Sequence, residues 1–265
     1  MKSTESYMVN DSTIYFILRL YMKIFYINLD RSPARNISSK HQLKIHNVEA
    51  ERFPAVDGAD YCSELGQFIF NKIETKKNYK LLRKNLIDND QLLKTDHPLG
   101  IGEIGIIQSL RKLFKLAVTK DLPRILVLED DFKLCNNFNN KLENVLKDAP
   151  QDANILYLGI SNLNRRFGSF ADIGNPTWQR PLGICSQDYI NRTFKSIRGS
   201  IFGCYGFIID RHAMQLYLNF TQIMTLPADV ILGHLATKHN RINSYSLKEE
   251  DLIKYFRMGT TIHGL

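Results

Sequence analysis

The stretch Arg124-Ile125-Leu126-Val127-Leu128-Glu129-Asp130-Asp131-Phe132 decides the fold, because an apolar run ends there in three consecutive acids. Four aliphatic residues in succession, two of them β-branched, predict a strand buried on both faces, as in a mostly parallel sheet. Unpaired charges are costly to bury, so the acids cannot share that core without partners. We therefore expect them at the rim of the sheet, where open α/β sheets bind their ligands.

Carboxylates at such a rim favour a divalent cation. Their hard oxygens suit Mg²⁺ or Mn²⁺, and an ion beside a strand end suits a substrate that carries phosphates. The alternative is an acidic loop that merely begins the next element. The local pattern leaves both interpretations open.

Composition and charge narrow the class of protein. A chain of 265 residues, 44% hydrophobic and 23% charged, is typical of a globular protein with a substantial core. Its net charge of +8 favours anionic partners, but the charge is diffuse, so nucleic-acid binding is not indicated. The four cysteines are far apart and include no C-x-x-C pair, which predicts buried free thiols rather than a zinc site or disulfides.

The first 21 residues look like a separate extension. Their apolar stretch, 14–18, is interrupted by Arg19 and Lys23 well short of a membrane-spanning length. No basic segment followed by a small-residue cleavage site marks a signal peptide. We expect residues 1–21 to be dispensable for folding and activity, residues 22–265 to form one domain, and the protein to be cytoplasmic, with peripheral membrane contact as one possibility.

The remaining pattern alternates between strands and helices, which predicts an α/β fold with right-handed parallel crossovers. The expected strands are residues 23–29, 53–58, 155–159 and 202–209. The expected helices are residues 33–45, one or two within 60–97, one from 102 to about 117, 138–146, 211–220, and one opened by 226–229. Residues 160–200 lose periodicity and carry several arginines, so they are either an acceptor-binding loop region or a solvated insertion. The tail from residue 245 has no strong pattern.

Four segments, taken in order, resemble glycosyltransferase family 25, the group of lipooligosaccharide β-galactosyltransferases and procollagen galactosyltransferases. They are FYINLDRSPAR at 25–35, FPAVDG at 53–58, GEIG at 102–105 with Gln108-Ser109 after it, and LVLEDD at 126–131. Weaker matches at 156–159, 205–209 and 226–229 extend the resemblance over about residues 22–235.

The resemblance implies a GT-A-like, Rossmann-type α/β fold with a mostly parallel central sheet flanked by helices. It also implies an inverting transfer of a hexose, assisted by Mn²⁺ or Mg²⁺, from a UDP-sugar to a hydroxyl of a glycan or protein, as in lipopolysaccharide biosynthesis. Galactose is the expected hexose, although one hydrogen bond to the sugar's 4-hydroxyl can decide between galactose and glucose.

Site residues follow from the same resemblance. Glu129 and Asp131 would hold the metal, and Asp229 would be the general base. The residues expected at the donor are Asn28, Asp30, Arg31, Arg35, Asp57, Gly102, Glu103, Ser109 and Asp130. Plainer interpretations stay open for Arg35 as a surface helix residue, Asp57 as a turn residue and Asp229 as a helix cap.

The chain also departs from the family pattern. Where the family has a cysteine after Gly105 and a Ser-His pair, this sequence has Ile106 and Leu110. If that histidine helps to bind nucleotide or acceptor, its absence predicts lower or altered activity. A non-catalytic nucleotide-sugar-binding relative is therefore one alternative, and a metal-dependent phosphoryl-transfer enzyme is another. The retained acids argue against full degeneration, because three rim carboxylates without a metal would repel one another.

Overall fold

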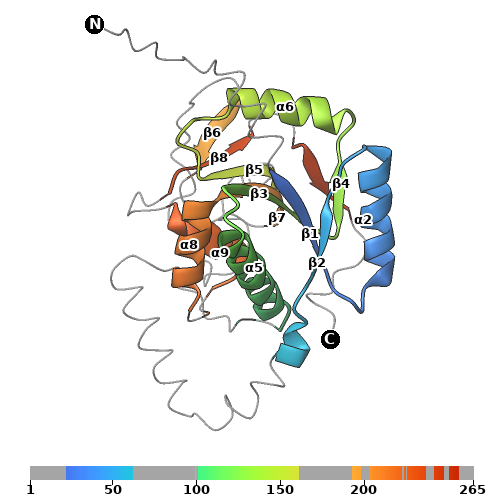
Figure 1. Cartoon of the computed structure of the whole chain (residues 1–265), viewed down its shortest axis with the longest axis vertical. Helices are drawn as coiled ribbons and strands as arrows, with labels where there is room; N and C mark the ends of the chain where they lie inside the picture. Colours follow the sequence, from blue (N-terminus) through green and yellow to red (C-terminus); the bar gives the residue numbers. More distant parts are fainter. Residues whose placement is uncertain are drawn as a thin grey trace, which may run out of the picture.

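The computed structural model describes residues 22–61, 99, 101–160, 193–197, 203–222, 224, 226–236, 242–247 and 251–256. Within them, a seven-stranded sheet and a smaller two-stranded sheet lie between helices (Figure 1). The expected N-terminal extension (1–21) lies outside the described residues, as do nearly all of the helical stretch expected at 60–97 and most of the proposed acceptor loop region at 160–200.

The large sheet has the order β2-β1-β3-β7-β5-β8-β6. Its strands are β1 (Lys23–Asn28), β2 (Glu51–Pro54), β3 (Arg124–Glu129), β5 (Ile155–Ile160), β6 (Phe194–Ile197), β7 (Cys204–Asp210) and β8 (Ser244–Leu247). The small sheet pairs β4 (Phe132–Leu134) with β9 (Ile253–Tyr255).

Strand direction confirms the expected mostly parallel sheet. β1 is parallel to β2 and β3, and β5 is parallel to β8. β7 runs antiparallel to both β3 and β5, and β6 runs antiparallel to β8. Five strands (β2, β1, β3, β5 and β8) therefore share one direction, and only β7 and β6 oppose it. The carboxyl ends of β1, β2 and β3 meet at one edge, so side chains distant in sequence gather there.

Helices cover both faces of the large sheet (Figure 1). One face carries α5 (Ile101–Thr119), α8 (Arg211–Phe220) and α9 (Ala228–Leu235), and the other carries α2 (Pro33–Ile45) and α6 (Phe138–Asp148). Successive side chains of a strand point to opposite faces, which splits β3 between two cores. Ile125 and Val127 pack with α5, α8 and α9, whereas Leu126 and Leu128 pack with α6 and the small sheet. The central strand is buried on both faces, as its sequence predicts.

Most elements lie close to their expected positions, and the differences have local causes. Pro33 opens α2, and Asp210 caps α8 by accepting a hydrogen bond from the Ala213 backbone N–H at 2.8 Å. β2 is earlier and shorter than the strand expected at 53–58. Two strands, β8 and β9, lie in the region where the sequence shows no pattern. The Ser-Tyr-Ser-Leu sequence of β8 is buried throughout, including its two serines, and its alternation of polar and apolar residues covers only four positions.

Two glycines let β9 lie directly against the large sheet. A Cβ on Gly159 would overlap the carbonyl oxygen of Ile253, and a Cβ on Gly206 would overlap the Ile253 side chain. Ile253 is fully buried as a result. We call this close contact the glycine notch; it fixes β9 beside the carboxyl end of β3.

None of the helices in the described part of the chain has the length and hydrophobicity needed to cross a bilayer.

Candidate functional site

The candidate site is built around Glu129, Asp130 and Asp131, which we call the acidic turn. It follows β3 at the edge where the parallel strands β1 and β2 also end. Alternation along β3 sends neighbouring acids in opposite directions. Glu129 continues the side of Ile125 and Val127, toward α5 and α9, whereas Asp130 contacts α2 through Arg35. The acidic turn therefore directs carboxylates to both faces of the sheet at this edge.

Asp130 is held by three neighbours. Its Oδ2 accepts a hydrogen bond from Asn28 Nδ2 at 2.7 Å, and its Oδ1 accepts from Arg35 Nη1 at 2.7 Å. The Ser39 hydroxyl donates to its backbone oxygen at 3.0 Å. Asn28, Arg35, Ser39 and Asp130 are all buried. Asp130 thus ties the ends of β1 and β3 to α2, which fixes the shape of the acidic turn.

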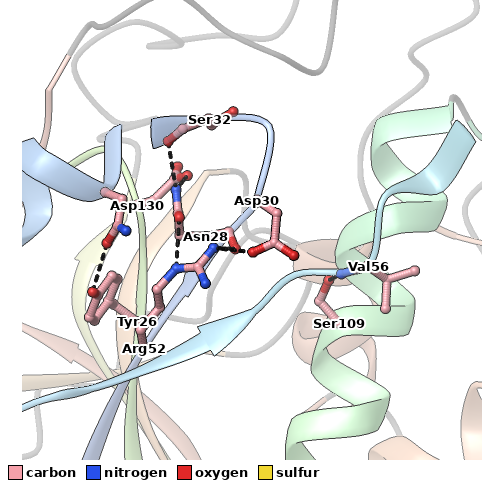
Figure 2. A network of polar contacts seen from close by, with 9 residues as sticks. Tyr26, Asn28, Asp30, Ser32, Arg52, Val56, Ser109 and Asp130 are labelled. Atoms are coloured by element: carbon pink, nitrogen blue, oxygen red, sulfur yellow. Dashed lines mark hydrogen bonds and ion pairs between the residues drawn. The ribbon is translucent and has the colours of Figure 1, made fainter. Parts of the chain in front are cut away.

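Arg52 sets the orientation of the Asn28 amide (Figure 2). Arg52 Nε donates to Asn28 Oδ1 at 2.9 Å, and Arg52 Nη2 donates to the Asn28 backbone oxygen at 3.1 Å. The same Nη2 donates to Asp30 Oδ1 at 2.6 Å. Because the amide oxygen faces Arg52, the amide nitrogen faces Asp130. Sequence reasoning missed Arg52. The available signal was an arginine directly before the strand expected at 53–58.

Asp131 is less completely paired than Asp130. Its Oδ2 lies 3.3 Å from Arg35 Nη1, and its backbone oxygen accepts from the Phe256 N–H at 2.6 Å. Its Oδ1 is buried and has no hydrogen-bond partner within the described residues. Burial raises the pKa of Asp131 to about 6; Arg35 opposes this rise and Asp130 adds to it. A buried carboxylate oxygen without a donor is suited to a cation.

Glu129 lies close to three other carboxylates. Burial raises its pKa well above the ordinary value, and the charges of Asp131, Asp229 and Asp130 raise it further, against Arg35. A divalent ion beside Glu129 and Asp131 would remove this repulsion. Among the described residues, no group of three or more His, Cys, Asp or Glu is arranged to hold a metal ion. Two carboxylates are nevertheless the usual protein share of a Mg²⁺ site completed by substrate phosphates, so these residues fit that kind of site.

Asp229 approaches from the other side of the sheet edge, in the first turn of α9. Its Oδ2 accepts from the Gly203 N–H at 2.9 Å, and its Oδ1 accepts from the Val230 N–H at 2.8 Å. Gly203 has a φ of 61°, a conformation that favours glycine. Burial raises the pKa of Asp229 to about 6; the backbone hydrogen bonds oppose the rise and Glu103 adds to it. Asp229 joins α9 to the start of β7, so it does more than cap its own helix.

Arg31 and Asp57 form an ion pair on the β1 and β2 side of the site. The hydrogen bond from Arg31 lowers the pKa of Asp57, which also accepts from the Ala59 N–H at 3.0 Å. Asp57 therefore makes the local turn contact that the plainer interpretation expects. Asp30 lies on the same side of the site, with 80% of its side chain accessible. Its only ion-pair partner among the described residues is Arg52.

The first half of α5 supplies the remaining expected residues. The Ser109 hydroxyl donates to the Gly105 backbone oxygen at 2.7 Å and accepts from the Val56 N–H at 2.8 Å (Figure 2). A Cβ on Gly105 would lie 2.9 Å from the Val56 oxygen, so the glycine permits this close approach. Gly102 and Glu103 lie in the first turn of α5. Leu110, at the position of the family histidine, is buried in the core of that face.

The expected residues thus form two groups. Asn28, Asp30, Arg31, Arg35, Asp57 and Asp130 lie on the β1, β2 and α2 side. Glu103, Glu129 and Asp229 lie close enough on the α5 and α9 side for their charges to interact. Asp131 is between the groups, since it contacts Arg35 and interacts with Glu129.

Comparison with known proteins shows which family the chain resembles. The profile of the family described as "Glycosyltransferase family 25 (LPS biosynthesis protein)" matches residues 21–232. The chain is 27% identical over 145 residues to mouse "Inactive glycosyltransferase 25 family member 3", a match that covers 54% of this chain and 22% of the mouse protein. It is 26% identical over 140 residues to human "Procollagen galactosyltransferase 2", covering 52% of this chain and 20% of that protein.

A "Glycosyltransferase 25 family member" of Drosophila melanogaster is 27% identical over 147 residues, which is 53% of this chain and 21% of that protein. The matches thus span about a fifth of the length of these curated relatives. The match to the family profile covers the acidic turn, the start of α5 and Asp229. The chain belongs to glycosyltransferase family 25.

Proposed function

We propose that this protein is an inverting, divalent-metal-dependent glycosyltransferase that moves a hexose from a UDP-sugar to an acceptor hydroxyl. The proposed donor is UDP-galactose, and the acceptor is a glycan or a hydroxylated protein. The observation that carries the proposal is the partly unsatisfied Asp131 carboxylate beside Glu129, at the edge where β1 and β3 end. The human relative named as a procollagen galactosyltransferase supports the choice of galactose.

The proposed donor site lies on the β1 and β2 side of the acidic turn. Arg31 and Arg35 carry the positive charge there, and the planar guanidinium group suits phosphate oxygens. Asp30 and Asp57 are acceptors for ribose or uracil groups. Asn28 and Asp130 are hydrogen-bonded to each other, so their proposed role is to hold Arg35 and the acidic turn in place. Gly102, Glu103 and Ser109, all on α5, are the remaining residues that we assign to the donor site.

Glu129 and Asp131 would hold Mn²⁺ or Mg²⁺, which supplies positive charge to the departing diphosphate. Asp229 takes the proton from the acceptor hydroxyl. The acceptor oxygen then bonds to the anomeric carbon as the bond from that carbon to the diphosphate oxygen breaks, and UDP leaves with the electron pair. A pKa of about 6 keeps Asp229 ionised near neutral pH while making it a stronger base than an ordinary aspartate.

The deciding experiment measures UDP release from a panel of UDP-sugars with Mn²⁺, with and without chelator. Asp229→Asn is expected to lower turnover by about 10²–10⁴-fold while UDP binding persists, because it removes the base alone. Asp131→Ala should abolish metal-dependent UDP binding. Asp210→Asn is the matched control, since Asp210 also lies at the start of a helix, and its other contacts, with Asn154 and Arg124, lie at the opposite end of β3 from the acidic turn. An Asp229→Asn protein with full turnover would remove Asp229 from this role.

A non-catalytic relative that binds nucleotide sugar is the second candidate. It is favoured by Leu110 in place of the family histidine and by the mouse relative that is named inactive. It predicts UDP-sugar binding in calorimetry without any UDP release. The phosphoryl-transfer alternative instead predicts no preference for UDP over DNA.

A further inference from the structure

Two tyrosines from different elements stack beside the acidic turn. The ring centroids of Tyr205 in β7 and Tyr255 in β9 are 5.3 Å apart, with planes inclined by 31°. We call this pair the aromatic shelf. Tyr255 is 36% exposed, and Phe256 after it is 43% exposed. The other large hydrophobic side chains exposed within the described residues, Ile37 and Ile45, lie apart on α2.

Backbone contacts attach the aromatic shelf to the acidic turn. The Phe256 N–H donates to the Asp131 backbone oxygen at 2.6 Å. Tyr255 pairs across the small sheet with Phe132, the residue that follows Asp131. On the other side, Tyr205 precedes Gly206, which pairs with Leu128 just before Glu129. The backbone of Tyr255 and Phe256 therefore lies beside Asp131, and the backbone of Tyr205 lies close to the end of β3.

The glycine notch fixes the position of the strand that carries Tyr255. Ile253, two residues before Tyr255, is held against Gly159 and Gly206 with no space for a further carbon. The Cys135 N–H adds a hydrogen bond to the Leu252 oxygen at 3.0 Å. A ligand that stacks on a fixed ring avoids the entropy cost of ordering it.

We infer that the aromatic shelf binds the pyranose ring of the acceptor, which makes the acceptor a glycan rather than a peptide. This rests on the proposed function. One face of a pyranose presents C–H groups with slight positive charge, and these pack on the negative face of an aromatic ring. The proposed nucleotide contacts lie on the β1 and β2 side of β3, and the shelf lies on the β7 side. The shelf is thus placed for the sugar that receives the hexose, not for the uracil.

The test is saturation-transfer NMR on the full chain without donor or metal, with methyl β-D-galactopyranoside and methyl β-D-glucopyranoside as probes. Sorbitol, a polyol without a ring face, is the control ligand. We expect transfer to the ring C–H protons of at least one pyranoside and none to sorbitol. Tyr255→Leu should weaken binding about tenfold, whereas Tyr255→Phe should retain it. Ile37→Ala, at an exposed apolar residue on α2, should also retain it.

No transfer to either pyranoside with the wild-type protein would overturn the inference. So would equal binding by Tyr255→Leu and wild type, or transfer to sorbitol as strong as to the pyranosides. Because the readout needs neither UDP nor turnover, it separates the two proposals. Failure of sugar binding in a protein that releases UDP would reject the shelf alone. Sugar binding in a protein that never binds UDP would retain the shelf and reject the transferase.

Discussion

Asn28 donates its side-chain amide to the carboxylate of Asp130 across 2.7 Å, although 102 positions separate them in the chain. This bond joins the ends of β1 and β3, and both partners are buried. The Asn28 oxygen is occupied by Arg52, so the amide has one orientation that satisfies both neighbours. The relative position of the ends of β1 and β3 is therefore fixed by side-chain hydrogen bonds as well as by the backbone hydrogen bonds of the sheet.

Asn28→Asp is expected to destabilise the protein by about 3 kcal/mol, because it places two buried carboxylates against each other at hydrogen-bond distance. Urea denaturation measures this change. Asn36→Asp is the matched control: Asn36 Oδ1 accepts from the Tyr26 hydroxyl at 2.8 Å, and an aspartate there keeps the acceptor. Equal stability of the two variants would contradict the role assigned to Asn28.

Arg35 neutralises both Asp130 and Asp131. Arg35→Met should lower the free energy of unfolding by about 3–5 kcal/mol near neutral pH, since it leaves buried carboxylates without their cation. The loss should shrink on acidification, because protonation removes the uncompensated charge. Arg211→Met removes a surface ion pair with Asp121 and should cost at most about 1 kcal/mol. A loss as small as that of Arg211→Met would show that Arg35 is not needed for this charge balance.

The raised pKa values make stability depend on pH. Burial raises the pKa of Asp131 and of Asp229 to about 6, against an ordinary 3.8. A carboxyl with a raised pKa in the folded state binds its proton more tightly there. Its contribution to stability is complete below about pH 4 and is lost as the pH rises through about pH 6. Asp57 acts in the opposite sense, because Arg31 lowers its pKa.

The variant Asp131→Asn isolates one of these groups. In chelator, its unfolding free energy should fall less than that of wild type between about pH 4 and about pH 7, by up to about 1.4 kcal/mol per pH unit. Asp229→Asn should also reduce the slope. Added Mn²⁺ at about pH 7 should stabilise wild type and Asp229→Asn but not Asp131→Asn. Parallel pH curves for wild type and Asp131→Asn would argue against a buried, titrating Asp131.

The glycine notch predicts two different responses to added methyl groups. Gly206→Ala meets the Ile253 side chain, so Ile253→Ala should relieve part of its cost of about 1–3 kcal/mol in a double-mutant cycle. Gly159→Ala meets the Ile253 backbone oxygen, so the same second substitution should give little relief. Denaturation curves of the single and double variants measure the coupling. Equal coupling at the two glycines would mean that β9 is not held in the way described.

Much of this arrangement could be predicted from local sequence. Leu126 and Leu128 alternate with Ile125 and Val127, and that unbroken apolar run is enough to predict a strand buried on both faces. The placement of acids at the rim follows from the cost of burying them. The opposite directions of the Glu129 and Asp130 side chains can also be predicted, because successive side chains of a strand point to opposite faces.

The rest depends on contacts between distant segments. Arg52 reaches Asn28 only because β2 pairs with β1 in a particular register, which no local pattern specifies. Ile253–Tyr255 is too short to predict as a strand, and its position depends on two glycines far away in the chain. The unpaired oxygen of Asp131 is likewise a property of packing rather than of the acidic motif.

The pairing of β4 with β9 has a consequence for biosynthesis. A ribosome makes β1, β2 and β3 early, so the Asn28 to Asp130 bond has all its parts once residue 130 has emerged. The Phe256 N–H that holds the Asp131 backbone oxygen is made more than a hundred residues later, because 256 − 131 = 125. Until then the nascent chain holds the residues of the proposed donor site on β1, β2 and α2 but lacks Tyr255 of the aromatic shelf. The aromatic shelf is therefore completed later in translation than the bond between Asn28 and Asp130.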